Sequence, residues 1–574
     1  MSRWSPGRLT ARAAVTHDGD GAGSSICSGD ERSTAPAAGP DDHTASRTAC
    51  RMAVTPRLSG WLSIMLLVAA SVTVGWLHDG WYDNDQWFIL ANGRYVLENG
   101  LPRQNPFSAW GGKIVLDDWL WAVLLHSAYT VCGQTGITLL CVTVDVGTIL
   151  LARSIARRLG AGRIASSITA AFYLLAQTLS MGMTDRPFVA SALMVMASVR
   201  IALEWVCRQW EWRGVWLLPV LTMTAFNLHM ADSWFTIAYP GCWLLASVAF
   251  AAGRKLRVLM TSASVAVVQI AATFVSPWGM DGVLFVFHGM GSASYRGQIK
   301  ETLPLPTVLG EIMDGSIYSS VDSLQTMLPA LALSLALAAV LAVTSVLWIA
   351  GSGDCRSKAT WLGVLVAVLG SIPLLLVAMR FTNDVLLLAP FVAGLAVNLK
   401  RDGRLWRAAG SGDMIAVIVA ALALALCAST GRPPESAAEY YERSETANVA
   451  ARAVSRLVPP GSPIMSDGWI GSKLTWLGYK TSFDMRPELV DSAVSGLPVD
   501  HYREWIDATM DTGKADEFVS KYADSFQWWV VRDYGPDRST PIGEAVSSRS
   551  GCRLASTAPG KYSLYECLAR STPR

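Results

Sequence analysis

Long apolar runs separated by short polar segments fill the chain from residue 59 to residue 428. Most of these runs approach the ~20 residues that an α-helix needs to cross the hydrocarbon core of a bilayer. The pattern predicts about eleven transmembrane helices, at residues 59–77, 135–156, 164–182, 187–206, 215–234, 235–252, 258–275, 327–350, 361–378, 384–397 and 414–428. The run at 384–397 is short for a span. The run at 118–131 is also short and predicts a helix that lies in the membrane interface.

Basic residues gather in short clusters between alternate apolar runs, which indicates how the chain is oriented. The clusters lie at residues 51–57, 153–163, 208–213, 254–257, 356–358 and 400–407. Because Lys and Arg are enriched in the cytoplasmic loops of membrane proteins, these clusters predict a cytoplasmic N-terminus. The same alternation predicts a first outer loop at 78–118 and a second outer segment at 276–326, and it places the C-terminal part of the chain outside the cytoplasm.

The two ends of the chain are polar but differ in pattern. Residues 1–56 are rich in Ser, Thr, Ala, Gly and Pro without an apolar period, which predicts a disordered cytoplasmic N-terminus. A start at Met52 is an alternative. Residues 57–429 form the predicted transmembrane domain, and residues 430–574 are long enough for a domain of their own.

Within residues 430–574, extended and helical stretches alternate. The extended segments lie at 463–467, 480–486, 527–533 and 561–567, between helical stretches such as 437–457 and 500–510. The predicted fold class is therefore an α-helical polytopic membrane protein with a C-terminal extracytoplasmic α/β domain.

The composition agrees with a membrane location. Of the 574 residues, 51% are hydrophobic and 16% are charged, whereas soluble proteins carry roughly 25% charged residues. We therefore expect a multi-pass protein of the cell membrane, with the lipid bilayer as a partner. The net charge of +2 gives no indication of a nucleic-acid partner.

The ten cysteines show no metal-binding spacing, and several lie in or beside apolar runs. Cys552 and Cys567 differ, because they flank two short extended segments around Pro559-Gly560. A disulfide between them is permitted outside the cytoplasm. The spacing alone leaves this pairing open.

Two acidic pairs stand in the aromatic first outer loop: Asp83 with Asp85, and Asp117 with Asp118. A carboxylate at the membrane surface can serve as the base for an acceptor hydroxyl beside a membrane-borne donor. The D-x-D spacing of Asp83 and Asp85 places both side chains on one face of a strand or turn. Asp117 and Asp118 are candidate ligands of the acceptor or a metal. The alternatives are that the first pair only solvates the loop and that Asp118 caps the following helix.

Further polar residues lie where predicted spans reach the outer surface. Asn227, His229 and Asp232 cluster near the end of the fifth span, where polar groups usually face a cavity. Arg380, at the outer end of the ninth span, is suited to pairing with a phosphate, or else it extends to the interface. His229 and Arg380 are therefore candidate substrate-binding residues, and a packing role for His229 is equally compatible. Weaker candidates in the second outer segment are Arg296, Lys300 and Glu301.

Other polar residues have plainer interpretations. Asp185-Arg186-Pro187 predicts a turn with a local ion pair. Asp145 lies inside a span, where a hydrogen bond with Gln177 or Gln269 is the expected arrangement. In the C-terminal part, four loop residues suit either an acceptor-sugar site or ordinary folding roles. They are Asp467, Trp469, Asp484 and Arg486.

Several motifs together resemble the GT-C superfamily of integral-membrane glycosyltransferases, which includes protein O-mannosyltransferases and the lipid A aminoarabinose transferase. The likeness rests on DNDQWFILANGRYVLENGLPRQNPFS at 83–108, followed by DDWLWAVLLHSAYTVCGQTGI at 117–137, a form seen in bacterial members. It continues with NLHMADSW at 227–234, SPWGMDG at 276–282 and MRFTNDVLLLAPF at 379–391, and so covers roughly residues 59–400. Ser276 replaces the Asn of the family's Asn-Pro-x-Gly motif, which leaves a polar role at that position open.

The resemblance implies an inverting transferase that moves a hexosyl or pentosyl group from a polyprenyl-phosphate donor to an extracytoplasmic acceptor, a cell-envelope glycan or protein. Asp83 or Asp85 would be the general base. No cofactor is certain; a divalent metal, Mg²⁺ or Mn²⁺, would be held by Asp83 and Asp85 if one is needed. The rival functions are a transporter or flippase of lipid-linked saccharide, for which the marker is Asp145, and a non-catalytic membrane scaffold.

Overall fold

The computed structural model describes Trp61 and residues 64–72, 85–179, 185–251, 253–291, 303–313, 321–394, 435–533 and 540–568. Several predicted features lie outside these residues: the segment 1–56, Asp83, the span 414–428, and the candidates Arg296, Lys300 and Glu301. The predicted domain boundaries near residues 56 and 429 also fall outside them and stay predictions.

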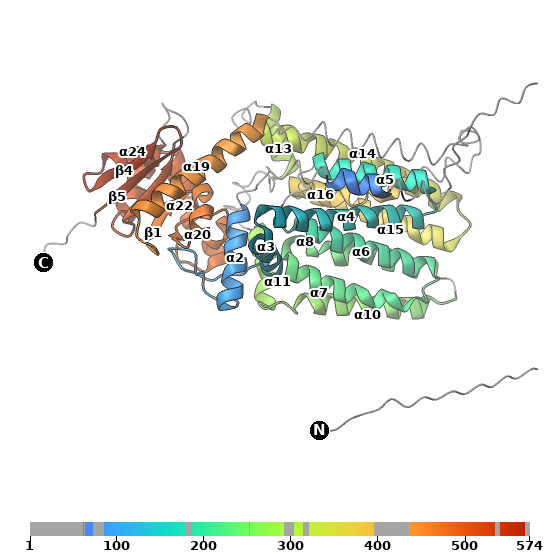
Figure 1. The fold of residues 1–574 in the computed structure, drawn as a ribbon. Helices are drawn as coiled ribbons and strands as arrows, with labels where there is room; N and C mark the ends of the chain where they lie inside the picture. Colours follow the sequence, from blue (N-terminus) through green and yellow to red (C-terminus); the bar gives the residue numbers. More distant parts are fainter. Residues whose placement is uncertain are drawn as a thin grey trace, which may run out of the picture. The chain divides into compact units, whose positions relative to one another are not determined.

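Residues 85–394, here called the helical region, consist mainly of helices (Figure 1). They are α2 (Asp85–Asn99), α3 (Trp119–Cys132), α4 (Gln134–Arg158), α5 (Arg163–Leu179), α6 (Phe188–Cys207), η1 (Arg213–Leu217), α7 (Leu218–Leu228), α8 (Met230–Ser233), α9 (Phe235–Phe250), α10 (Lys255–Thr273), α11 (Met280–Gly291), α13 (Leu305–Met313), α14 (Val321–Gly351) and α15 (Cys355–Val377). Among the described residues, six helical segments are long and apolar enough to cross a membrane: α4, α6, α8 with α9, α10, Ala330–Gly351 of α14, and α15. This supports a multi-pass membrane protein. The predicted number of eleven spans is not confirmed.

Aromatic rings and glycines meet in the interior of the helical region. Trp243 of α9 stacks on Phe391, with 5.1 Å between the ring centroids. Gly363 of α15 faces the same indole so closely that an added Cβ would lie 2.6 Å from it. A small residue is therefore needed where α15 crosses α9, as is common between transmembrane helices.

The predicted span at 384–397 is wrong as a single helix. The described residues form three short pieces instead: η4 (Met379–Phe381), α16 (Thr382–Leu386) and η5 (Ala389–Val392). Leu386–Ala389 and Phe391 are buried, and η5 packs against α4, α5 and α14. Pro390 offers no N–H to continue a helix from α16. The described part of this apolar run therefore packs in the protein interior.

A helix that was not predicted, α2, occupies much of the first half of the predicted first outer loop. This helix packs against α3 and, on another side, against α20 (Gly468–Trp476). At Gly93, an added Cβ would lie 2.1 Å from the carbonyl oxygen of Ala122, so the α2–α3 crossing needs glycine. Residues 88–93 are all buried. A helix enclosed on several sides lacks the 3.6-residue period by which it is recognised in a sequence.

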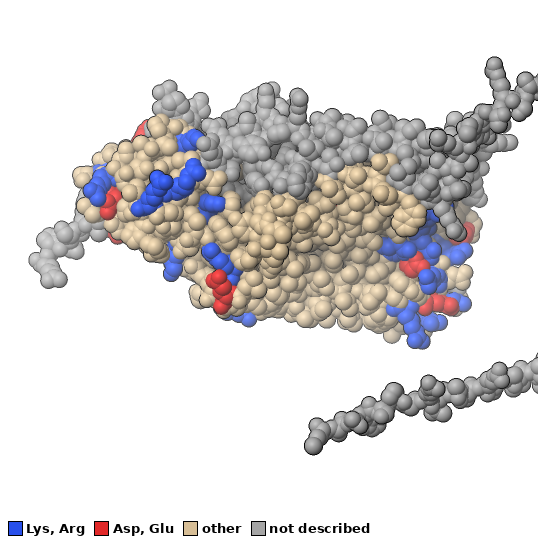
Figure 2. Space-filling view, viewed as in Figure 1, with Lys and Arg blue, Asp and Glu red and all other residues tan. Residues whose placement is uncertain are grey.

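Charged side chains gather at one end of the helical region and on the sheet region, with an uncharged band of surface over the helices between them (Figure 2). At the first of these ends, Arg158 of α4 pairs with Glu204 of α6 at 3.0 Å. Arg254, before α10, pairs with Glu211 at 2.6 Å. These ion pairs bring together three basic clusters that were predicted to share the cytoplasmic side. Which side of the membrane this end faces stays a prediction.

Residues 435–568, here called the sheet region, form a five-stranded sheet with helices on both faces. The strands are β1 (Pro463–Ser466), β2 (Lys480–Thr481), β3 (Trp528–Arg532), β4 (Cys552–Ala558) and β5 (Tyr562–Cys567), and the helices are α19 (Glu435–Leu457), α20, η6 (Pro487–Leu489), α21 (Ser492–Ser495), α22 (His501–Met510), α23 (Thr512–Tyr522) and α24 (Pro541–Ser548). The strand order is β2-β1-β3-β5-β4, with β2, β1 and β3 parallel and the β5–β4 hairpin antiparallel. The predicted α/β region is present, although only two residues of segment 480–486 are strand.

Residues 107–110, which belong to the predicted first outer loop, join this sheet region. Ser108 bridges to Thr481 of β2, where the Ala109 amide donates to the Thr481 carbonyl at 2.8 Å. Just beyond, Trp110 stacks on His501 with 3.9 Å between the ring centroids. Tyr522 meets the same indole edge-on, at 4.8 Å. The segment therefore extends the sheet beyond its edge strand and contributes a side chain to its core.

A disulfide joins Cys552 of β4 to Cys567 of β5, which are direct partners in the hairpin. Their Cα atoms are 3.9 Å apart, and the bond closes the hairpin at the end opposite its turn. Outside the cytoplasm such a cross-link persists.

Candidate active site

A break in the helix between α7 and α9 creates the centre of the candidate site. His229 is extended, with φ −166° and ψ 104°, so α7 ends at Leu228 and α8 begins at Met230. The Met230 N–H donates to the carbonyl oxygen of Asp117 at 2.9 Å instead of to its own helix. The carbonyl oxygen of Asp117 therefore accepts the hydrogen bond of the N–H that the helix break leaves without a partner in its own helix, as buried backbone requires.

The side chains at this break form a buried polar chain. His229 Nδ1 lies 3.0 Å from Ser191 Oγ and 3.2 Å from Asp232 Oδ2. The other oxygen of Asp232 lies 3.4 Å from Nη2 of Arg380. Asp232 is only 4% exposed, while a quarter of the Arg380 side chain is exposed. Arg380 thus remains accessible to a ligand, and Asp232 orients both of its basic neighbours.

Asp117 and Asp118 lie directly beside this chain. Asp117 is partly exposed and is close enough to His229, Arg380 and Arg486 to interact with them electrostatically. Asp118 is 5% exposed, and although it precedes α3, its side chain makes no capping hydrogen bond. The alternative in which Asp118 serves to cap this helix is therefore not supported.

The sheet region supplies two further ionisable groups, Arg486 and Glu488. Arg486 donates to Asn92 of α2 at 2.9 Å, pairs with Asp484, and lies 4.6 Å from the Phe88 ring centroid. It is 7% exposed and interacts electrostatically with Asp118. Arg486 therefore fixes the sheet region to α2 and brings positive charge to the acidic pair.

Burial shifts the acids of this cluster towards their neutral forms. It raises the pKa of Asp118 to about 8, with a further contribution from the charge of Asp117 and opposition from Arg486. The pKa of Asp117 is also raised by burial, and His229 is the main opposing charge. For Glu488, burial raises the pKa to about 8. Burial alone would lower the pKa of Arg486, but Asp484 together with Glu488 and Asp118 opposes it, and the pKa is raised.

Asp85 pairs with an arginine from the turn before α6. It is the first residue of α2, and its Oδ2 lies 3.0 Å from Nη2 of Arg186. Arg186 thus joins that turn to α2, and its predicted local ion pair with Asp185 stays a prediction. Whether Asp83 lies beside Asp85 falls outside the described residues.

The structure also bears on a metal site and on the remaining candidate residues from the sequence. Within the described part of the chain, no group of three or more His, Cys, Asp or Glu side chains is arranged to hold a metal ion. Asp467 caps α20 by accepting from the Ile470 N–H at 2.8 Å, and Arg532 lies 6.0 Å from the Trp469 ring centroid. Gln269 donates to Thr222 and to the Thr236 carbonyl. Its amide nitrogen is therefore used within α7, α9 and α10, while its Oε1 has no hydrogen-bond partner among the described residues, so Gln269 makes no hydrogen bond with Asp145. Pairing of Asp145 with Gln177 stays a prediction.

The structure brings together Asp117, Asp118, His229 and Arg380, all of them candidates in the sequence. It adds Asp232, Arg486 and Glu488, whose place in this cluster was not predicted. Spacing gave a signal for Asp232, three residues after His229. For Arg486 and Glu488 there was none, because they follow Asp118 by hundreds of residues and lie in another region of the fold.

No family model matches the chain, and no curated protein matches it. Among solved structures, a crystal structure of ArnT from Cupriavidus metallidurans bound to undecaprenyl phosphate matches at 12% sequence identity, covering 90% of this chain and 100% of that chain. The TM-score is 0.37. At this level the likeness defines neither the fold nor the activity of this chain.

Proposed function

We propose that this protein is a membrane glycosyltransferase that moves a sugar from a polyprenyl-phosphate donor to an extracytoplasmic acceptor of the cell envelope. One observation carries the proposal: a partly exposed carboxyl group, Asp117, faces His229, Arg380 and Arg486 where the apolar helices meet the sheet region. Positive groups at the edge of a membrane domain suit the phosphate of a lipid-linked donor. A base at the same place suits the hydroxyl of an acceptor that comes from the water side.

The proposed division of labour follows from charge. Sugar transfer from a phosphate needs a base for the acceptor hydroxyl and positive charge for the departing phosphate. A carboxyl group with a raised pKa holds a proton more firmly than an ordinary aspartate, which suits Asp117 as the base. Arg380, held by Asp232, suits the phosphate. Direct attack by the acceptor inverts the anomeric carbon.

Two acidic pairs are candidates for the base. Asp85 is engaged by Arg186 at 3.0 Å, whereas Asp117 faces the polar chain at the helix break. We therefore place Asp117 ahead of Asp85, with Asp118 as a buried partner that adjusts its charge. Asp83 remains a candidate from the sequence.

The test uses membranes that contain the full chain and a set of radiolabelled polyprenyl-phosphate sugars. Release of polyprenyl phosphate and label in envelope acceptors are both measured. We expect Asp117→Asn to reduce transfer by roughly 10²–10³-fold. Asp516→Asn, an exposed acid on α23, is the matched control and should have no effect. Full activity of Asp117→Asn with loss in Asp83→Asn or Asp85→Asn would move the base to the first pair, and full activity in all of them would defeat the proposal.

Assays on the same membranes distinguish a transferase from a transporter of lipid-linked saccharide. A transporter of lipid-linked saccharide should depend on Asp145 and not on Asp117, and should give flux in proteoliposomes without any release of polyprenyl phosphate. For the metal proposed at Asp83 and Asp85, chelation followed by Mg²⁺ or Mn²⁺ addition is the direct measurement. Lost activity that either ion restores would support a metal, and unchanged activity would remove it.

A further inference from the structure

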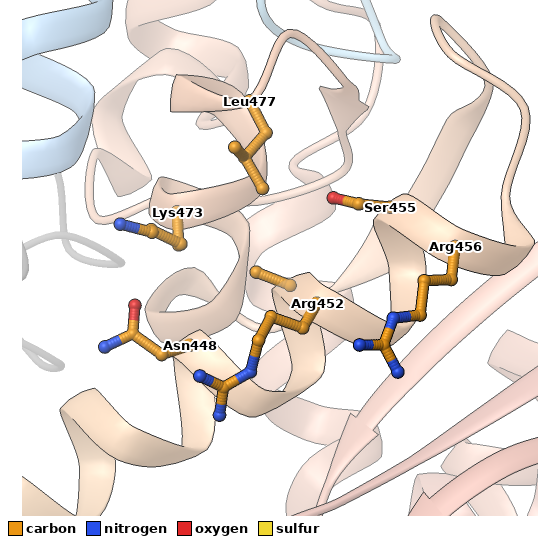
Figure 3. A pocket seen from close by; sticks show the side chains of 7 residues that line it. Asn448, Arg452, Ser455, Arg456, Lys473 and Leu477 are labelled. Atoms are coloured by element: carbon orange, nitrogen blue, oxygen red, sulfur yellow. The ribbon is translucent and has the colours of Figure 1, made fainter.

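A surface pocket of about 390 Å³ lies between α19 and α20 of the sheet region (Figure 3). Its lining consists of Asn448, Ala451, Arg452, Ser455, Arg456, Lys473 and Leu477. Every charged residue in this lining is a cation. The pocket shares no residue with the cluster around Asp117.

The two arginines of the pocket stand one turn apart on α19, where like charges disfavour a helix. Among the described residues, neither Arg452 nor Arg456 has an ion-pair partner. At the far end of the helical region, by contrast, Arg200 and Arg208 share Glu204. Both arginines are exposed, so their charges are available to an anion that binds between them and α20.

Lys473 forms the opposite wall of the pocket and is partly buried. Its Nζ lies 2.9 Å from the centroid of the Trp87 ring on α2, and burial lowers its pKa to about 7. The charged groups that face it across the pocket are Arg452 and Arg456, both positive. An anion in the pocket would favour the charged form of the lysine and so gain from it.

Two neutral hydrogen-bond donors also line the pocket. Asn448 and Ser455 offer an amide and a hydroxyl from α19. Figure 3 shows the Lys473 amine, the Asn448 amide and the Arg452 guanidinium extending to the same side of the pocket. A guanidinium binds phosphate through two parallel hydrogen bonds, and a tetrahedral phosphate accepts further donors from other directions.

We propose that this pocket binds a phosphate group, carried either by a soluble phosphate ester or by a phospholipid headgroup. The proposal does not rest on sugar transfer. The pocket lies beside α2, which the sheet region already contacts through Lys473 and Trp87. A phosphate there would join α19 to α20 at the wall of the sheet region that rests on the helical region.

The experiment uses the purified full chain in detergent and two probes. Inorganic pyrophosphate is titrated and followed by ³¹P NMR. Phosphatidic acid is compared with phosphatidylcholine by native mass spectrometry. We expect Arg452→Gln with Arg456→Gln to weaken binding by roughly tenfold or more. Arg503→Gln, which removes an exposed helical arginine elsewhere in the sheet region, should leave binding unchanged.

A double Lys variant at Arg452 and Arg456 keeps the charge but loses the paired donors, so binding between that of the wild type and that of the double Gln variant is expected, which guards against a loss caused by misfolding. Binding of pyrophosphate would show that a soluble phosphate group is sufficient, and binding of phosphatidic acid alone would identify a headgroup. Equal binding by the wild type and the double Gln variant, or no binding of either probe, overturns the proposal. Asp117→Asn should still bind, so failure of this site and failure of the transferase are distinguishable.

Discussion

Asp118 and Glu488 show how burial alters a carboxyl group that looks ordinary in the sequence. Each has a pKa raised to about 8, and each approaches Arg486. Glu488 remains partly exposed, so solvent screens part of its shift. At neutral pH the cluster therefore carries less negative charge than its acids suggest, which lets it lie beside apolar helices.

Stability should fall as pH rises across the window set by Asp118. Its pKa is raised from 3.8 to about 8, so between these values the folded protein keeps a proton that the unfolded chain releases. The unfolding temperature should therefore decrease from about pH 4 to about pH 8 and then level. In Asp118→Asn the decrease should be smaller, as measured by tryptophan fluorescence on heating. An unchanged slope, equal to that of Asp516→Asn, would contradict the shift.

The contact between Arg380 and Asp232 predicts a graded loss of transfer. Arg380→Gln removes positive charge from the proposed phosphate position and should lower transfer by roughly 10²-fold, as loss of one transition-state donor does. Arg380→Lys keeps the charge but loses the planar donor pair, so an intermediate rate is expected. Steady-state rates of polyprenyl phosphate release provide the measurement. Arg213→Gln, an exposed arginine at the other end of the helical region, is the control; an equal effect there would remove the special role of Arg380.

Residue types and spacing singled out some of the residues that the structure brings together. His229 and Asp232 were grouped because they lie three positions apart near the end of one predicted span, and Asp117 and Asp118 because they form an acidic pair in an aromatic loop. Arg486 was placed in a loop but not against Asp118. Only the tertiary fold joins these two, since no local pattern relates residues in different regions.

At the scale of elements, apolar length predicted helices reliably where lipid-sized runs were uninterrupted, as in α4, α6, α10 and α15. It failed where the environment was protein rather than lipid. Residues 384–394 are as apolar as a span but are largely buried, and their helix is interrupted after Leu386. α2 was missed because it is enclosed on several sides. Hydropathy measures the transfer of a side chain out of water, and it does not distinguish transfer into the protein interior from transfer into lipid.

Two glycines at which a helix closely approaches another stretch of backbone make a prediction. A Cβ at Gly93 would lie 2.1 Å from the Ala122 carbonyl oxygen, and a Cβ at Gly471 would lie 1.8 Å from that of Phe483. Gly93→Ala and Gly471→Ala should each destabilise the protein by about 2–3 kcal/mol, because backbone must move. Gly241→Ala in α9 meets nothing within 4 Å and should be tolerated. Thermal unfolding in detergent measures all three, and equal unfolding temperatures would show that these crossings can relax.

At the scale of the whole molecule, cysteines at the two ends of the spans test the predicted orientation. Cys132, at the end of α3, and Cys355, at the start of α15, are both exposed and free. A membrane-impermeant maleimide on intact cells should label Cys132 and spare Cys355, since the alternation of basic clusters puts them on opposite sides. The reverse labelling would invert the topology and remove the extracytoplasmic acceptor from the proposal.

The hairpin disulfide adds a second whole-molecule prediction. Cys552 and Cys567 should resist the maleimide until a reductant is added, because they are bonded to each other. Their sequence separation is 15, for which loop closure gives a stabilisation of about 3 kcal/mol. A double Ser variant should therefore unfold at a lower temperature, with helical content kept. Labelling of both cysteines before reduction would show that the bond does not form in the cell.

Trp110 has a consequence for how the protein is made. The indole stacks on His501, and the neighbouring Ser108 bridges to Thr481 of β2. Trp110 is therefore synthesised early, whereas both of these partners are synthesised only after the helical region. Its aromatic surface stays uncovered during that interval, so chains that stop before β2 should be cut by proteases more readily than the full chain.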